Sequence, residues 1–139
     1  MMGRPLFPEP KTVAQFFRFG LVGGVGFLVD VLMLYLGLFA LGLGRIPAGL
    51  FSFPFAVTVT WFGNRRFVFP DAAPMAASRQ WRRFVFVCAL GLVLNRGTYA
   101  LLVSALPFVY AHPVLGVIGG TAAGMFFNFI AAKKHVFKV

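Results

Sequence analysis

The chain has 139 residues, of which 60% are hydrophobic and 12% are charged, a balance that excludes an ordinary soluble domain. The formal net charge is +10, but the basic residues separate apolar runs and do not form one basic face, which argues against nucleic-acid binding. The chain has a single cysteine, Cys88, so no disulfide can form within it. This cysteine lies within an apolar run. Composition therefore predicts a small multi-pass membrane protein.

Four apolar runs predict four transmembrane helices, because about 20 apolar residues are enough for one helix to cross a bilayer. Residues 1–18 are expected to form a polar cytoplasmic leader. The predicted spans cover residues 19–43, 47–63, 84–106 and 114–132. The expected fold is an all-α membrane protein with a single four-helix transmembrane domain at residues 19–139.

The distribution of Lys and Arg predicts the orientation of these spans. Three of these residues fall in or next to the leader, five in the loop after the second span, and three at the C-terminus. The other two connections contain only Arg45, and Arg96 lies inside the third span. Since cytoplasmic loops carry the excess of positive charge, both termini are predicted to be cytoplasmic.

The chain also resembles itself, which predicts two parallel two-helix repeats related by an axis along the membrane normal. A shift of 65 residues pairs Gln15, Arg18, Phe19, Gly26 and Asp30 with Gln80, Arg83, Phe84, Gly91 and Asn95. A shift of 68 pairs Thr60, Arg65, Arg66, Val68 and Phe69 with Asn128, Lys133, Lys134, Val136 and Phe137. Chance similarity between apolar segments is the alternative, but the polar positions match as well as the apolar ones.

Two charged residues are predicted near the membrane centre. Arg96 lies about 12 residues into the third span, or about 18 Å at 1.5 Å per residue, and Asp30 is at a similar depth in the first. A guanidinium there is tolerated mainly beside an anion or in a wet cavity. Two compatible interpretations remain. Asp30 and Arg96 form a structural pair, or they line a polar cavity with Asn95, where Arg96 binds phosphate and Asp30 accepts sugar hydroxyls or shuttles a proton.

Polar residues at the predicted cytoplasmic ends of the second and fourth spans are further candidates. These residues are Asn64, Arg65, Arg66, Lys133 and Lys134. Either they only fix orientation and contact anionic lipid headgroups, or they form an access site for a lipid phosphate. Gly116, Gly120, Gly124 and Asn128 recur every four residues along the fourth span, which predicts close packing against another helix.

Motifs for catalysis are missing from the sequence. It has no Gly-rich nucleotide loop and no His/Cys set at metal-ligand spacing, because His112 and His135 fall in connections predicted at opposite membrane faces. We therefore expect a protein that is not an enzyme and that uses no metal or cofactor.

Residues 15–24 (QFFRFGLVGG), Asp30 and residues 64–69 (NRRFVF) together resemble the GtrA-like family. Asn128 and residues 133–137 (KKHVF) look like the final span of the same family, so that the resemblance covers about residues 15–138. The chain departs from the family pattern at Phe67, where Trp is usual. It also departs at Ala132 and His135, where a second Asn and an aromatic residue are expected.

This resemblance implies a function in cell-surface polysaccharide synthesis, namely translocation of a polyprenyl-phosphate-linked monosaccharide across the bacterial inner membrane. It implies as partners this sugar lipid, membrane lipids and a polyprenyl-phosphate glycosyltransferase. Four short helices make a thin wall around such a path, so we also expect a homodimer. One alternative is a non-transporting scaffold for a glycosyltransferase. Another is a proton-coupled exporter of cations using Asp30, which the extra cation Arg96 disfavours.

Overall fold

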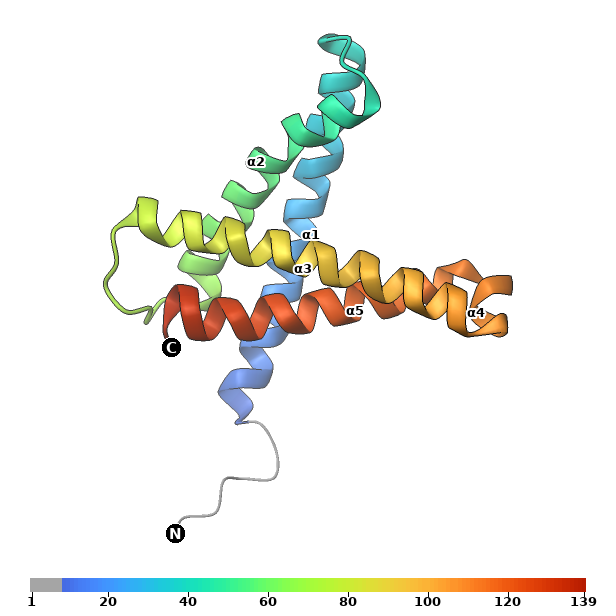
Figure 1. The fold of residues 1–139 in the computed structure, drawn as a ribbon. Coiled ribbons are helices and arrows are strands. Elements are labelled where there is room, and N and C mark those ends of the chain that lie inside the picture. The colour runs from blue at the N-terminus through green and yellow to red at the C-terminus, as the bar shows by residue number, and fades with distance from the viewer. Residues whose placement is uncertain (1–8) are drawn as a thin grey trace. The chain divides into compact units, whose positions relative to one another are not determined.

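The computed structural model describes residues 9–139, and every regular element in this part of the chain is a helix (Figure 1). The chain divides into two compact units, Met1–Ala72 and Ala73–Val139, called here the first and second units. Residues 1–8 of the predicted leader lie outside the described part.

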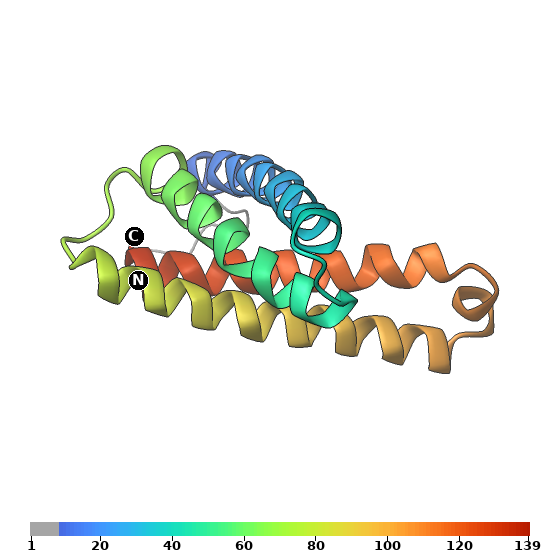
Figure 2. The ribbon, with the colours of Figure 1, turned by 90° about the horizontal axis from the view of Figure 1, so that it is seen from above.

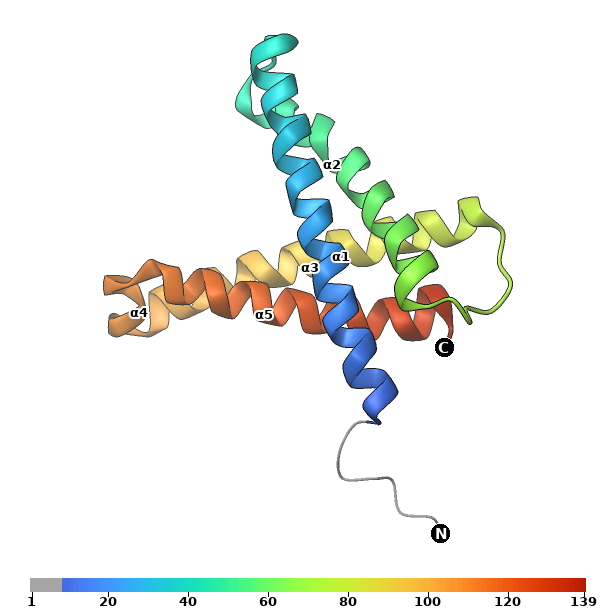
Figure 3. The same cartoon turned by 180° about the vertical axis from the view of Figure 1, so that it is seen from behind.

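The first unit is a helical hairpin (Figure 3). Helix α1 (Pro10–Tyr35) continues into a π-helical turn, η1 (Leu36–Ala40), and α2 (Arg45–Gly63) continues into a second one, η2 (Asn64–Val68). The connection between them turns at Gly42, whose φ of 64° is readily adopted by glycine. The two long helices therefore run antiparallel and pack along their length.

The second unit is also a hairpin (Figure 2). Helix α3 (Ala77–Ala105) is followed by the short α4 (Pro107–Ala111), by α5 (Pro113–Ala131) and by the π-helical η3 (Ala132–Phe137). Both α4 and α5 begin at a proline. Proline suits the first turn of a helix, because the N–H group that it lacks would have no partner within the helix at that position.

The glycines of α5 face α3, as the four-residue spacing predicts. A Cβ added at Gly116 would lie 3.0 Å from the Tyr99 ring, and one at Gly124 would lie 3.1 Å from the carbonyl oxygen of Gly91. At Gly120 it would lie 2.5 Å from the carbonyl oxygen of Asn95. The small residues thus allow the two backbones to approach closely, the usual basis of helix association in lipid.

The two units contain similar contacts at corresponding residues. Phe19 meets Phe69 edge-on in the first unit, with ring centroids 6.5 Å apart, and Phe84 meets Phe137 in the second at 6.1 Å. Gln15 and Gln80, each four residues before the phenylalanine on the same helix, are both buried. A side chain at Gly26 would collide with Thr60, and one at Gly91 with Asn128. The common orientation of the two hairpins in the membrane stays a prediction.

The four predicted spans are confirmed as helices, but their ends differ. The segments long and apolar enough to cross a membrane are Pro10–Ala40, Arg45–Val68, Ala77–Ala105 and Pro113–Phe137. The first and third begin earlier than the apolar runs, and the last ends later, because helical hydrogen bonding continues into polar sequence. The connection after the third span, expected to be only a short link, contains α4.

Candidate functional site

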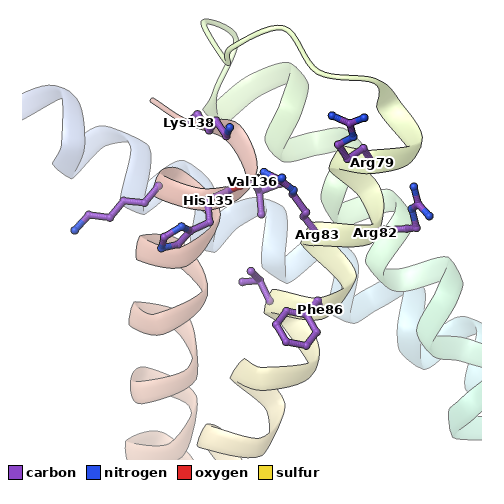
Figure 4. Close-up of a pocket in the computed structure, with 9 residues that line it drawn as sticks. Arg79, Arg82, Arg83, Phe86, His135, Val136 and Lys138 are labelled. Carbon is purple, nitrogen blue, oxygen red and sulfur yellow. Dashed lines mark hydrogen bonds between the residues drawn. The ribbon is translucent and has the colours of Figure 1, made fainter.

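A strongly basic cavity lies at the end of the second unit where α3 begins and η3 ends (Figure 4). It measures about 640 Å³ and is called here the basic pocket. Its lining residues are Arg79, Arg82, Arg83, Phe86, Val87, Lys134, His135, Val136 and Lys138. The second unit contains no Asp or Glu, so no side chain of this unit neutralises the pocket.

Helical spacing brings these cations together. Arg79 and Arg83 are four residues apart on α3, whereas Lys134 lies in η3 and Lys138 is the residue that ends it. Residues at this spacing lie on one side of a helix. At Lys138 the backbone turns into the left-handed region, with φ of 55°, and the next N–H, that of Val139, donates to the carbonyl of Lys133 at 3.0 Å. The pocket is therefore built on ordered backbone.

Arg83 is the best-placed cation of the pocket. Its guanidinium extends between α3 and η3, whereas Arg82 points away from η3 (Figure 4). Arg83 Nη1 donates a hydrogen bond to the carbonyl oxygen of His135 at 3.2 Å. A guanidinium has five N–H donors, so others remain for an anionic ligand. Its planar shape suits the paired oxygens of a phosphate.

A second cavity of about 400 Å³, called here the apolar groove, lies between α3 and α5. It is lined by Phe86, Val87, Leu90, Phe127, Ile130, Ala131 and His135. Three of these residues, Phe86, Val87 and His135, also line the basic pocket, so the two cavities adjoin. The second unit therefore presents a cationic cavity next to a hydrocarbon-lined one.

The predicted site residues of the second unit lie at two levels. Lys134 lines the basic pocket, whereas Lys133 is outside its lining and has its ammonium 6.0 Å from the centre of the Phe129 ring. Asn95 and Asn128 both lie in the α3–α5 interface, where they contact glycines. The Oδ1 atom of Asn128 is buried and has no hydrogen-bond partner among the described residues.

At the end of the first unit the predicted residues are differently placed. Asn64 is completely buried, and neither atom of its amide group has a hydrogen-bond partner in the described part of the chain. Arg65 lies over the ring of Trp61, 5.6 Å from its centre, and Arg66 is exposed. The two arginines are thus accessible to an anion, whereas Asn64 is not.

Asp30 and Arg96 lie in different units. In the first, Ser52 Oγ lies 2.6 Å from Asp30 Oδ1 and 3.1 Å from the carbonyl oxygen of Gly49. The single hydroxyl proton can serve one acceptor at a time, and the shorter distance favours the carboxylate. In the second, Arg96 is exposed on α3. The structure therefore gives the surroundings of Asp30 and of Arg96 only within the unit of each, and an ion pair between these two residues stays a hypothesis.

Sequence reasoning missed most of the basic pocket. Its unforeseen residues are Arg79, Arg82, Arg83, Phe86, His135 and Lys138. From the sequence alone, the arginines of this set are interpreted as signals of orientation, and Arg83 also as part of the repeat. Their helical spacing could have identified them, because the face carrying Arg79 and Arg83 continues directly into Phe86 and Leu90.

Comparison with known proteins agrees with this picture of a multi-pass membrane protein. The family profile described as GtrA/DPMS, transmembrane domain, matches residues 18–137 and so includes parts of both units. No curated protein matches the chain. The family match suggests a part in lipid-linked sugar handling or polysaccharide synthesis, within a generally non-enzymatic membrane family. The chain belongs to the GtrA/DPMS transmembrane domain family.

Proposed function

We propose that the protein moves a polyprenyl-phosphate-linked monosaccharide across the bacterial inner membrane for cell-surface polysaccharide synthesis. The observation that carries this proposal is the basic pocket, in which arginine and lysine side chains gather in a unit without any Asp or Glu. Charge-assisted hydrogen bonds from such side chains suit a phosphate. The adjoining apolar groove suits a ligand that also carries hydrocarbon.

The excess of basic residues at this end of the helices favours a cytoplasmic location for the pocket. A sugar lipid made by a glycosyltransferase on that side would meet the pocket first. Lys133 and the first unit's Arg65 and Arg66 would add positive charge at the same membrane face, and anionic headgroups gather at such charges.

Movement beyond the pocket requires polar groups at mid-membrane depth. Arg96 would offset the cost of bringing a phosphate into a region of low dielectric constant. Asp30 and Asn95 would replace water around sugar hydroxyls, with the interfacial amide of Asn128 nearby in the second unit. A homodimer would supply a thicker wall around this path than one chain does.

Reconstitution into vesicles tests the proposal. Synthetic polyprenyl-phosphate-linked monosaccharides carrying a neutral hexose, an N-acetylhexosamine or a pentose would be placed in the outer leaflet. Their arrival in the inner leaflet would then be followed from loss of accessibility to an impermeant reagent. We expect the protein to accelerate movement of at least one of these lipids well above the rate in protein-free vesicles. If none of the three lipids moves faster than in protein-free vesicles, the transport proposal is removed and a scaffold is favoured.

A further inference from the structure

We infer that the basic pocket and the apolar groove of the second unit form one binding site for a single-chain lipid phosphate. The phosphate would lie beside Arg83, and the first isoprenoid units of the chain would lie in the groove. This inference rests on the proposed function and adds the place and the manner in which its lipid is held.

The first argument is the junction between the two cavities. Phe86, Val87 and His135 line both, so a ligand can pass from one to the other without leaving the protein surface. Apart from His135, the groove is lined only by apolar side chains. A free phosphate or a soluble sugar phosphate would use the basic pocket and leave this groove unfilled. A lipid phosphate has a part that matches each cavity.

The second argument is direction. Along α3 the lining runs from Arg83 through Phe86 to Leu90, a rise of about 10 Å at 1.5 Å per residue. On α5 the groove extends from Ala131 back to Phe127, also away from the polar end. The groove thus leads from the cationic end into the apolar part of the helices. A prenyl chain whose phosphate stays at the membrane surface must take this direction.

The third argument is charge, which selects the occupant. A second copy of this chain could also cover an apolar groove. A symmetric contact through this groove would bring the two basic pockets close together, with no Asp or Glu side chain from either second unit between them. Like charges repel, whereas a lipid phosphate neutralises the pocket. The occupant that fits both charge and polarity is therefore the anionic lipid.

Comparison of corresponding residues assigns this site to the second unit. Arg79, Arg82, His135 and Lys138 correspond to Ala14, Phe17, Phe67 and Pro70 in the first unit. Only Arg83 and Lys134 have basic counterparts, Arg18 and Arg66. The first unit has therefore not retained the residues that make the cavity basic. Arg18 provides a control matched to Arg83 in residue type and position in the repeat.

The test is equilibrium binding to the full chain in neutral detergent, measured by calorimetry with protein-free micelles as the blank. The probes are farnesyl phosphate, inorganic phosphate and farnesol, which separate the contributions of chain and charge. We expect farnesyl phosphate to bind about tenfold or more tightly than either of the other two. Arg83→Gln should weaken its binding about tenfold, whereas Arg18→Gln should change it less than about twofold.

A second pair of variants tests the groove itself. Ala131→Phe would fill the groove and should reduce the affinity for farnesyl phosphate to that for inorganic phosphate. Ala122→Phe makes the same change at an exposed position of α5 outside the groove and should have no effect. Light scattering on the same samples should show the same oligomeric state for both variants.

Each contrary result has a distinct meaning. Equal affinity for farnesyl phosphate and inorganic phosphate would overturn the lipid site and leave the transport proposal standing. Loss of self-association in Ala131→Phe, without loss of chain-dependent binding, would show that a second copy covers the groove. Equal effects of Arg83→Gln and Arg18→Gln would overturn the assignment to the second unit. Normal binding without transbilayer movement in vesicles would remove the transport proposal alone.

Discussion

Arg83 Nη1 donates a hydrogen bond to the carbonyl oxygen of His135 at 3.2 Å and so joins the first turns of α3 to η3. This carbonyl lies in a π-helical segment, where the wider turn changes the usual backbone pairing. The bond holds the guanidinium between the two elements while other N–H groups stay available. One residue therefore both closes the end of the hairpin and supplies the charge of the basic pocket.

Replacing Arg83 by lysine tests this double role. Arg83→Lys keeps the charge but loses the planar fork that can reach a carbonyl and a phosphate together. We expect lipid-phosphate affinity between that of the wild type and that of Arg83→Gln. The relative loss as salt rises should be steeper, because lysine keeps the Coulomb attraction that salt screens but loses the paired hydrogen bonds. Binding of farnesyl phosphate at low and high salt would measure this. Affinity for Arg83→Lys equal to that of Arg83→Gln at every salt concentration would show that charge alone contributes little.

Close packing of α3 against α5 makes a clear prediction about stability. A Cβ at Gly120 would lie 2.5 Å from the carbonyl oxygen of Asn95, a backbone atom that cannot move by rotamer change. We expect Gly120→Ala to lower the free energy of unfolding by about 1–3 kcal/mol, as overpacking does. Thermal unfolding in detergent would measure the effect. Gly97→Ala is the control, because a Cβ there meets nothing within 4 Å, and its stability should stay near that of the wild type.

The sequence predicted the four helices because the length of an apolar run directly reports whether it can cross a bilayer. It placed helix ends less well, since hydropathy changes at Phe84 while the backbone of α3 is already helical from Ala77. The glycine stripe was interpreted correctly from spacing alone. Its four-residue period defines one face of a helix whatever the partner is.

The candidate site was harder to predict because it depends on which residues of different helices meet. Nothing local connects Arg83 with His135, which are separated by 52 residues. The bond between Ser52 and Asp30 likewise needs the register of α1 against α2. Sequence reasoning identified Asp30 and Lys134 as candidates from charge and depth. It could not predict that Asp30 accepts a hydrogen bond from Ser52 or that Lys134 lines a cavity with residues of α3.

Asp30 provides a test in which charge and hydrogen bonding are separated. Asp30→Asn keeps an oxygen that can accept the proton of Ser52, and it introduces the residue type found at the corresponding position, Asn95. We expect unfolding close to that of the wild type, whereas Ser52→Ala should lose about 1–3 kcal/mol because the half-buried Asp30 carboxylate loses its hydrogen bond. If Asp30 handles sugar hydroxyls or a proton, Asp30→Asn should slow transport severalfold in vesicles. Unchanged transport would reduce Asp30 to a structural residue.

Arg96 allows a similar test at the predicted membrane centre. It is exposed on α3, and its own unit has no carboxylate with which it could pair. Its removal should therefore leave the second unit folded, and Arg96→Gln should unfold within a few degrees of the wild type. Transport should fall about tenfold or more, because a phosphate crossing the middle of the membrane would lose its only fixed cation on α3 at that depth.

Arg45→Gln is the matched control for Arg96→Gln. It removes the same charge from the exposed start of α2, in a connection predicted on the opposite side of the membrane from the basic pocket. Equilibrium binding of farnesyl phosphate should be unchanged in both variants, since neither residue lines the pocket or the groove. A loss of transport in Arg96→Gln with normal folding and normal binding would place its effect in the crossing step. Wild-type transport by Arg96→Gln would contradict a role for this guanidinium in crossing.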